Sequence, residues 1–341
     1  AGDVWVNVSQ SNNANPTPAN YGGQTLLHEI GHAIGLSHPS DYNAASGETA
    51  PVTYADDADY YEDSRQYTVM SYFNESNTGG SFRGVYASSP LLDDIAAAQM
   101  EYGANMRTRI GDTVYGFNSN ADQPWLKVAS ANTPMVTAVW DAGGEDTFDF
   151  SGYASNQVID LRAGFFSSVG GLTGNVAVAQ GAQIENAVGG IGADVIHGNA
   201  GDNKLFGGPG ADTIDGGSGG SNYLRGEDGN DSLIGGADFD DINGNRGNDV
   251  VRGGGGRDWV VGGQDQDLLY GDDGDDVVYG NLGDDTVFGG DGKDWVRGGQ
   301  GDDVVDGGAG DDLLWGDRGN DTVSGGAGAD MFHIFAGAGT D

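Results

Sequence analysis

Three histidines and one glutamate fall within a short segment near the start of this chain, from His28 to His38. His28 and His32 are four residues apart, so on a helix both imidazoles lie on one face. Gly35 can adopt the positive φ that ends a helix, which would bring His38 back to the same point. Three nitrogen ligands and an open fourth position are typical of a catalytic zinc ion. Glu29, next to the first ligand, is placed to act on water there as a general base.

The alternative for this segment is a surface helix that carries two solvated histidines. The added glycine and third histidine make the zinc interpretation far more specific than the short motif alone. The two remaining histidines, His197 and His333, occupy equivalent positions of a repeat, and we interpret them as incidental.

The composition is strongly acidic and rich in glycine, with a net charge of −38, 64 glycines and no cysteine in 341 residues. Such a chain would repel phosphate, which excludes nucleic acid as a partner. No apolar run reaches transmembrane length. The same composition is typical of disorder, but here the acidic residues are periodic, which predicts a repeat fold instead.

From residue 189 the sequence repeats every nine residues as GGxGxDxUx, where U is apolar. Four copies precede a single extra residue, placed at Arg225, and twelve further copies run from 226 to 333. Asn203 and Ser221 are expected to replace the sixth-position aspartate in two copies. That aspartate is present in the other fourteen: Asp194, Asp212, Asp231, Asp240, Asp249, Asp258, Asp267, Asp276, Asp285, Asp294, Asp303, Asp312, Asp321 and Asp330.

This pattern predicts a flat parallel β-roll in which two repeats, eighteen residues, make one turn. Each copy would contribute a six-residue turn and a three-residue strand whose apolar residue points inward. Each aspartate would then lie beside the aspartate eighteen residues further on. Stacked carboxylates need a cation between them, and Ca²⁺, with about six to eight oxygen ligands, fits. We therefore predict that the aspartates are structural calcium ligands.

A second element follows the histidines, at Thr68–Phe73, where metzincin-like proteases have their Met-turn. With it the chain resembles the serralysins, secreted bacterial metzincins. The resemblance is carried by the histidine segment, the calcium repeat and the following residues: Pro39–Ala44, Met70, Tyr72, Asp94–Ala97, Tyr102–Asn105 and Gly111–Phe117.

The resemblance implies zinc-dependent hydrolysis of peptide bonds, with Glu29 as general base and then general acid. Met70 would form an apolar floor beneath the imidazoles. Tyr72 would both ligate the zinc through its phenolate and stabilise the oxyanion by swinging away. The alternative for Tyr72 is a half-buried aromatic residue near the Met-turn.

The resemblance also implies calcium ligands outside the sixth-position aspartates. In the repeat, backbone carbonyls of neighbouring copies would complete each site. Ahead of the repeat, one calcium would be shared by two segments, with Glu185 at a further ligand position. The residues of that shared site are Arg109, Gly111, Thr113, Asp141, Gly143, Gly144 and Asp146.

The expected fold class is a partial α+β metzincin-type catalytic domain followed by an all-β parallel roll. We divide the chain into the C-terminal part of a protease domain (1–106), a linker with the first roll strands and calcium sites (107–188), the repeat roll (189–333) and the start of a C-terminal cap (334–341). The strand-like segment Asp3–Val8 corresponds to one just upstream of the family's active-site helix. The chain is therefore expected to be a fragment, truncated at both ends.

Two functions are compatible with these features. The first is a secreted, calcium-stabilised zinc endopeptidase acting on proteins or peptides, exported by a type I pathway, with a separate N-terminal polypeptide as a candidate partner. The second is a catalytically silent calcium-binding module associated with the cell surface or an S-layer. The intact ligand set and Glu29 favour the enzyme.

Overall fold

The computed structural model describes residues 15–40 and 52–334. The chain forms two compact units, an N-terminal unit (Ala1–Asp149 and Arg162–Ile184) and a roll unit (Phe150–Leu161 and Glu185–Asp341). The expected strand at Asp3–Val8, residues 41–44 of the proline-led run and the segment 335–341 of the expected cap lie outside the described residues.

The N-terminal unit contains the helices. Among the described residues these are α1 (Tyr21–Ala33), α2 (Tyr54–Asp57), η1 (Glu75–Thr78), α3 (Leu92–Tyr102) and η2 (Pro124–Leu126). The helix α1 begins at Asn20, whose side chain accepts a hydrogen bond from the Gly23 N–H at 2.8 Å. One core cluster of this unit includes Val69, Met70 and Leu91, with Leu27 of α1 against it.

Short strands complete the N-terminal unit. The parallel pair is β1 (Val114–Gly116) with β3 (Thr147–Asp149). A second sheet has the order β2 (Thr137–Val139), β6 (Val176–Val178), β5 (Phe166–Ser167), in which only β5 runs antiparallel.

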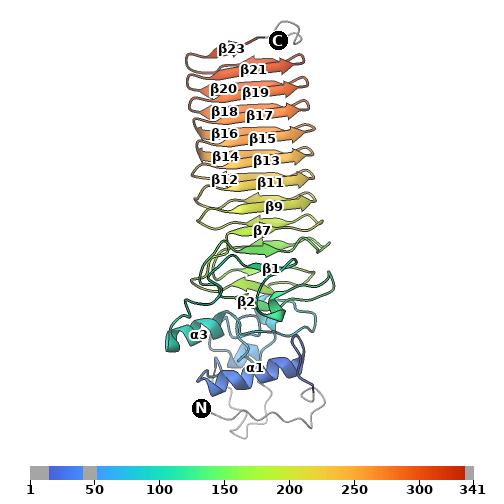
Figure 1. Cartoon of the computed structure of the whole chain (residues 1–341), viewed down its shortest axis with the longest axis vertical. Helices are drawn as coiled ribbons and strands as arrows, with labels where there is room; N and C mark the ends of the chain where they lie inside the picture. Colours follow the sequence, from blue (N-terminus) through green and yellow to red (C-terminus); the bar gives the residue numbers. More distant parts are fainter. Residues whose placement is uncertain (1–14, 41–51, 335–341) are drawn as a thin grey trace. The chain divides into compact units, whose positions relative to one another are not determined.

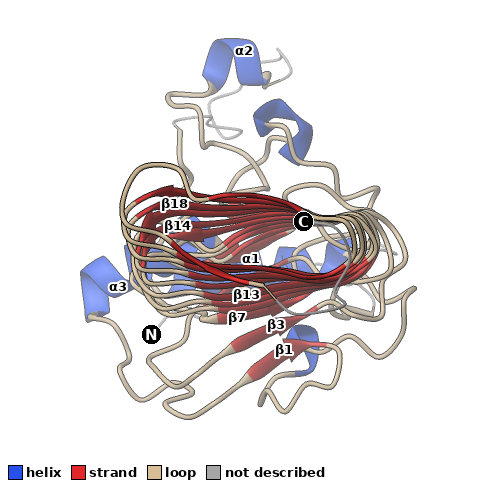
Figure 2. Cartoon of the chain, turned by 90° about the horizontal axis from the view of Figure 1, so that it is seen from above, coloured by secondary structure: helices blue, strands red, loops and turns tan. Residues whose placement is uncertain are grey.

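The roll unit is a parallel β-solenoid of two facing sheets, and this confirms the predicted β-roll. Figure 1 shows its strands stacked in chain order, and Figure 2, along the stack, shows the two flat layers. The odd-numbered strands form the odd sheet: β7 (Asn186–Val188), β9 (Lys204–Pro209), β11 (Tyr223–Asp228), β13 (Asp241–Arg246), β15 (Trp259–Gln264), β17 (Val277–Leu282), β19 (Trp295–Gln300), β21 (Leu313–Arg318) and β23 (Met331–His333). The other strands form the even sheet: β4 (Val158–Asp160), β8 (Val195–His197), β10 (Thr213–Asp215), β12 (Ser232–Gly236), β14 (Val250–Gly256), β16 (Leu268–Gly274), β18 (Thr286–Asp291), β20 (Val304–Ala309) and β22 (Thr322–Ser324).

The register follows the eighteen-residue turn. Val260 pairs with Val278 and Val278 with Val296, each beside the residue two copies later. These eighth-position side chains are completely buried between the sheets. The core is therefore one apolar residue deep per copy, which leaves little hydrophobic area to stabilise the roll.

The strands are longer than predicted. Most span five to seven residues, because the first residues of each turn continue the parallel pairing, as where Gly263 pairs with Asn281 and Gln264 with Leu282. Gly263 pairs in the sheet at a positive φ of +128°, a backbone conformation that glycine adopts without strain.

The placement of the extra residue at Arg225 is wrong. Leu224, not Tyr223, is the buried eighth-position residue, and it pairs with Leu205. The sixth position is occupied by Asn222 and not by Ser221, since the Asn222 N–H donates to Asp240 at 2.7 Å. The insertion lies in the preceding turn, where an added residue leaves the strand register intact.

None of the helices in the two described stretches is long and apolar enough to span a membrane.

Candidate metal centres

The C-terminal end of α1 is a turn that returns the chain toward the helix. Gly35 has φ +103°, and the Leu36 N–H donates to the Gly31 carbonyl at 3.0 Å. This is the hydrogen bond of a Schellman motif, which satisfies the last carbonyls of a helix. The turn places His38 beside the two helical histidines, as the sequence predicts.

The three imidazoles of His28, His32 and His38 converge, with one ligand atom from each lying within 4.8 Å of the others. The Nε2 atom of His38 lies 3.2 Å from that of His28 and 3.1 Å from that of His32. Tetrahedral zinc with Zn–N bonds of about 2.0–2.1 Å holds its nitrogens about 3.3 Å apart. The spacing therefore fits one zinc ion.

Backbone carbonyls fix the ring tautomers of the two helical histidines. The Nδ1 atom of His28 lies 2.9 Å from the Val69 carbonyl, and that of His32 lies 2.9 Å from the Leu36 carbonyl. Donation from Nδ1–H leaves an unprotonated Nε2 on each ring, which is the form that binds a metal. Burial, followed by the neighbouring His28 and His32, lowers the pKa of His38. The ring of His38 thus favours the neutral state that binds a metal.

The expected Met-turn packs against α1 at Gly31, between the two helical histidines. Met70 is buried, and a Cβ added at Gly31 would meet its Sδ at 2.5 Å. Asp94 of α3 holds the turn, because it accepts the Thr68 hydroxyl at 2.5 Å and the Val69 N–H at 2.9 Å. Val69 in turn orients His28. Asp94 is a positioning residue that the sequence argument cited only as part of a family motif.

Tyr72 lies beside the histidines. Its ring centre is 4.6 Å from that of His38 and 5.6 Å from that of His28, and its side chain is 48% exposed. Burial, then the charge of Glu29, raises the pKa of Tyr72. The exposed position leaves room for the phenol to move, as its expected role requires.

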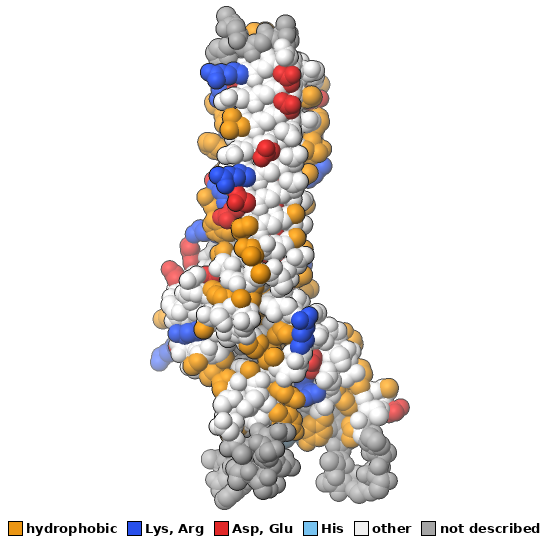
Figure 3. Space-filling view, turned by 90° about the vertical axis from the view of Figure 1, so that its right-hand side faces the viewer, with side chains coloured by type: hydrophobic (Ala, Val, Ile, Leu, Met, Phe, Trp, Pro, Cys, Tyr) orange, Lys and Arg blue, Asp and Glu red, His pale blue; other side chains and the backbone are white. Residues whose placement is uncertain are grey.

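In the roll, the sixth-position aspartates form two ladders, one for each row of turns. Each backbone N–H donates to Oδ1 of the aspartate two copies later, for example Asp258 to Asp276 at 2.8 Å and Asp276 to Asp294 at 2.9 Å. The adjacency predicted from the nine-residue period is therefore present. Figure 3 shows that a row of turns exposes mainly backbone and uncharged side chains, because these carboxylates are buried.

In most of these carboxylates the second oxygen has no hydrogen-bond donor. Among the described residues, a buried Oδ2 without a partner occurs in Asp212, Asp231, Asp240, Asp249, Asp258, Asp267, Asp276, Asp285, Asp294, Asp303 and Asp312. Buried unpaired carboxylate oxygens are costly in a folded protein. A cation between the turns would satisfy them.

Carbonyl oxygens converge on the same spaces. A Cβ added at Gly253 would lie 2.5 Å from Asp258 Oδ2 and 2.6 Å from the Gly271 carbonyl. The equivalent atoms at Gly280 are Asp285 Oδ2 at 2.3 Å and the Gly298 carbonyl at 2.6 Å. First-position glycine thus keeps open a cradle lined by hard oxygen atoms, which suits calcium.

Burial is the main cause of the raised pKa of these carboxylates. It raises the pKa of Asp303 and Asp258 to about 7, that of Asp276 to about 6 and that of Asp267 to about 8. Neighbouring carboxylates add to the effect. Without a metal, the ladders hold protons more tightly than free aspartate does.

The two sixth-position asparagines close their turns differently. The Asn203 amide donates to the carbonyls of Gly201 and Gly216, and the Asn222 amide donates to Gly220 at 3.4 Å and Gly235 at 3.5 Å. The asparagine amides thus donate hydrogen bonds to backbone carbonyls that, in the turns with aspartate, are left to bind a cation.

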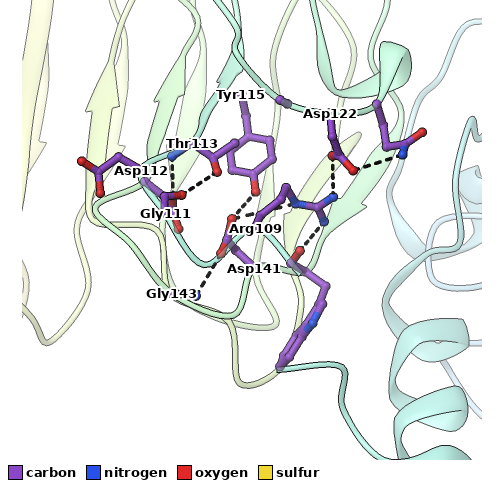
Figure 4. A network of polar contacts seen from close by, with 12 residues as sticks. Arg109, Gly111, Asp112, Thr113, Tyr115, Asp122, Asp141 and Gly143 are labelled. Carbon is purple, nitrogen blue, oxygen red and sulfur yellow. Dashed lines mark hydrogen bonds and ion pairs between the residues drawn. The ribbon is translucent and has the colours of Figure 1, made fainter. Parts of the chain in front are cut away.

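Both segments of the first expected calcium site lie within the N-terminal unit (Figure 4). The Thr113 N–H donates to Asp146 at 2.8 Å, and a Cβ at Gly144 would meet the Gly111 carbonyl carbon at 2.7 Å. The two predicted segments, 109–113 and 141–146, therefore lie side by side.

The side chain of Arg109 was not anticipated in this site. Its guanidinium pairs with Asp122 at 3.0 Å and lies 3.9 Å from Asp141. Asp141 accepts hydrogen bonds from the Tyr115 hydroxyl and, at 2.9 Å, from the Gly143 N–H. Asp122 carries no motif signal, and Tyr115 was cited only as part of the run Gly111–Phe117, with no role of its own. Glu185, the further expected calcium ligand, lies in the roll unit directly before β7. Its backbone carbonyl accepts a hydrogen bond from the Lys204 N–H at 3.3 Å.

Comparison with known families gives a match over most of the chain. Residues 104–339 match the family described as Peptidase M10 serralysin C terminal. The chain belongs to this family.

Serralysin relatives are similar over a little more than half of the chain. Serralysin B of Dickeya chrysanthemi is 55% identical over 196 residues, 58% of this chain and 40% of the relative. Serralysin of Proteus mirabilis is 53% identical over 206 residues, 60% of this chain and 41% of the relative. The metalloprotease AprA of Pseudomonas entomophila is 55% identical over 210 residues, 60% and 42% of the two chains. The aligned part spans about two fifths of the length of these relatives.

The serralysin family match covers the calcium-site candidates but not the zinc centre. It begins at residue 104, after His28, His32, His38 and Tyr72. The zinc centre is therefore supported by its own geometry, and the roll by both geometry and family.

Proposed function

We propose that this chain carries the metal centre of a secreted, zinc-dependent endopeptidase whose roll is stabilised by calcium. The observation that supports it most is the convergence of three imidazole Nε2 atoms at zinc-binding distances, with two Nδ1 atoms tied to carbonyls. Names of the relatives, serralysin and metalloprotease, support the same class of activity.

The residues divide the chemistry between them. His28, His32 and His38 would hold one zinc ion, which when bound supplies a Lewis acid that lowers the pKa of water and polarises a carbonyl. The Glu29 carboxylate would take the proton from the attacking water and pass it to the leaving amine nitrogen. The Tyr72 hydroxyl would both ligate the zinc and, after moving, donate to the developing oxyanion.

The roll would serve folding outside the cell. Its carboxylates and carbonyls need calcium, so folding is coupled to the calcium concentration of the surroundings. This supports export before folding and an extracellular site of action on proteins or peptides. A separate N-terminal polypeptide that completes the substrate cleft, and association with a cell surface, remain parts of this proposal.

Casein hydrolysis by the full-length protein tests the proposal. We expect cleavage that a zinc chelator abolishes and added zinc restores. Glu29→Ala should reduce kcat at least about a hundredfold, the contribution typical of a general base, while zinc content stays unchanged. Glu101→Ala on the exposed face of α3 is the matched control. Hydrolysis that resists the chelator, or that survives Glu29→Ala, would refute the proposal.

A further inference from the structure

The outer face of the odd sheet carries a long groove of about 1120 Å³. Its lining comes from seven consecutive strands of this sheet, from β9 to β21. Since neighbouring strands are about 4.8 Å apart, the groove extends for about 29 Å along the roll. The groove is therefore long enough to hold an extended polymer chain.

The lining combines aromatic, amide and ion-paired side chains. Tyr223 and Tyr279 contribute rings, and Gln264, Asn281 and Gln300 contribute exposed amides. Rings offer flat apolar faces, and amides both donate and accept hydrogen bonds. Glycines between these columns leave space for a chain to lie against the sheet.

The charge of the groove is nearly balanced, in contrast to the rest of the protein. Four arginines and three carboxylates line it, although the whole chain has a net charge of −38. Arg246 pairs with Asp228 at 3.1 Å, Arg297 pairs with Asp317, and Arg225 is held by Asp241. Paired in this way, these three arginines present fixed hydrogen-bond donors and little free charge.

These properties exclude several kinds of polymer. Nucleic acid and other polyanions would be repelled by the strongly negative chain. A peptide that adds to a sheet needs an unpaired edge, whereas β15 and β17 inside the groove are paired on both sides. A purely apolar ligand would cover the exposed amides without offering them hydrogen-bond partners.

We propose that the groove binds an uncharged polysaccharide. Sugar rings carry apolar faces that stack on aromatic side chains, and hydroxyl groups that pair with amides and ion-paired arginines. The strand spacing of about 4.8 Å presents successive outward-facing side chains at a distance comparable with one sugar ring. The roll thereby holds the chain on a glycan surface, independently of the zinc centre.

Binding of neutral hexasaccharides of β-linked glucose, mannose and N-acetylglucosamine to the calcium-loaded full chain tests this proposal. We expect saturable one-to-one binding of at least one of them by calorimetry. Tyr279→Ala should weaken it about tenfold, equivalent to about 1.4 kcal/mol. Gln300→Ala, at an exposed position, should weaken it about threefold without affecting the fold.

The matched control lies on the opposite sheet. Tyr270 is the ninth residue of its copy, as Tyr279 is of the next copy. The guanidinium of Arg252 lies 3.9 Å from the ring centre of Tyr270, and that of Arg225 lies 3.5 Å from the ring centre of Tyr223. Tyr270→Ala should leave the affinity unchanged. Equal losses in the Tyr270 and Tyr279 variants, or no binding of any neutral hexasaccharide, would overturn the proposal. So would preferential binding of polygalacturonate or a proline-rich peptide, or self-association that occupies the groove.

Discussion

Removing calcium should unfold the roll at slightly alkaline pH, and acid should restore it. Burial raises the pKa of Asp303 from 3.8 to about 7, and several other ladder carboxylates behave alike. A group whose folded pKa is raised binds protons more tightly when folded. The folded state is therefore favoured at low pH, and this advantage is lost as the pH rises from the unfolded pKa through the folded one.

The free-energy cost of ionising the ladder carboxylates decides whether the calcium-free roll stays folded. A pKa that rises from 3.8 to about 7 costs about 4 kcal/mol for each carboxylate that is ionised without a metal. A domain is usually stable by only about 5–15 kcal/mol. Even if water entering the turns halves the cost, a few ionised ladder positions exceed the total stability. Calcium would remove this cost by pairing with the free Oδ2 atoms.

The assay is far-UV circular dichroism on protein stripped of calcium with a chelating resin. At about pH 8 we expect loss of the β signal, and at about pH 5 its recovery, because the carboxylates with pKa values of about 6–8 are then protonated. Calcium added at about pH 8 should have the same effect as acid. A calcium-free roll that stays fully folded at about pH 8 would refute the reasoning.

A single substitution, Asp303→Asn, should change the stability of the roll in opposite directions with and without calcium. Asp303→Asn should stabilise the calcium-free roll at about pH 8 by up to about 4 kcal/mol, since it removes a buried charge. In saturating calcium the same change should destabilise it, since a ligand oxygen is lost. Asp302→Asn, one residue earlier and exposed, should do neither. An effect of the same sign in both conditions would contradict the calcium assignment.

Three further outcomes follow from packing and positioning. Leu269→Ala should lower the free energy of unfolding of the calcium-loaded roll by about 2–5 kcal/mol, because Leu269 is fully buried, and Leu268→Ala should cost much less, as denaturant titration would show. Gly31→Ala should lower the melting temperature of the N-terminal unit, with about 1–3 kcal/mol of strain, because the new Cβ would meet Met70 Sδ at 2.5 Å. Asp94→Asn should weaken zinc binding about tenfold to a hundredfold, measured by chelator competition, because the Met-turn that orients His28 loses its anionic acceptor; unchanged affinity would count against this role.

Local spacing allowed much of this protein to be predicted from sequence. The separation of His28 and His32, and the glycine before His38, depend only on helical geometry and on one positive φ. The nine-residue period likewise fixes which residues point inward and which carboxylates are neighbours, because each copy contacts only adjacent copies. Where the period is interrupted, sequence alone misplaced the insertion by several residues. A turn tolerates an added residue and a strand does not, so burial of Leu224 was needed to locate it.

Tertiary structure decided the features that depend on residues distant in the chain. Asp94 supports His28 through Val69, and Arg109 reaches Asp122 and Asp141, across separations that no motif records. The groove on the odd sheet arises only when side chains from seven strands are aligned by the roll. The sequence by itself determined the ligand types and the repeat, because these depend on chemistry and short-range geometry. Their positioning residues and the shared surface appeared only with the fold, because they depend on which strands and helices become neighbours.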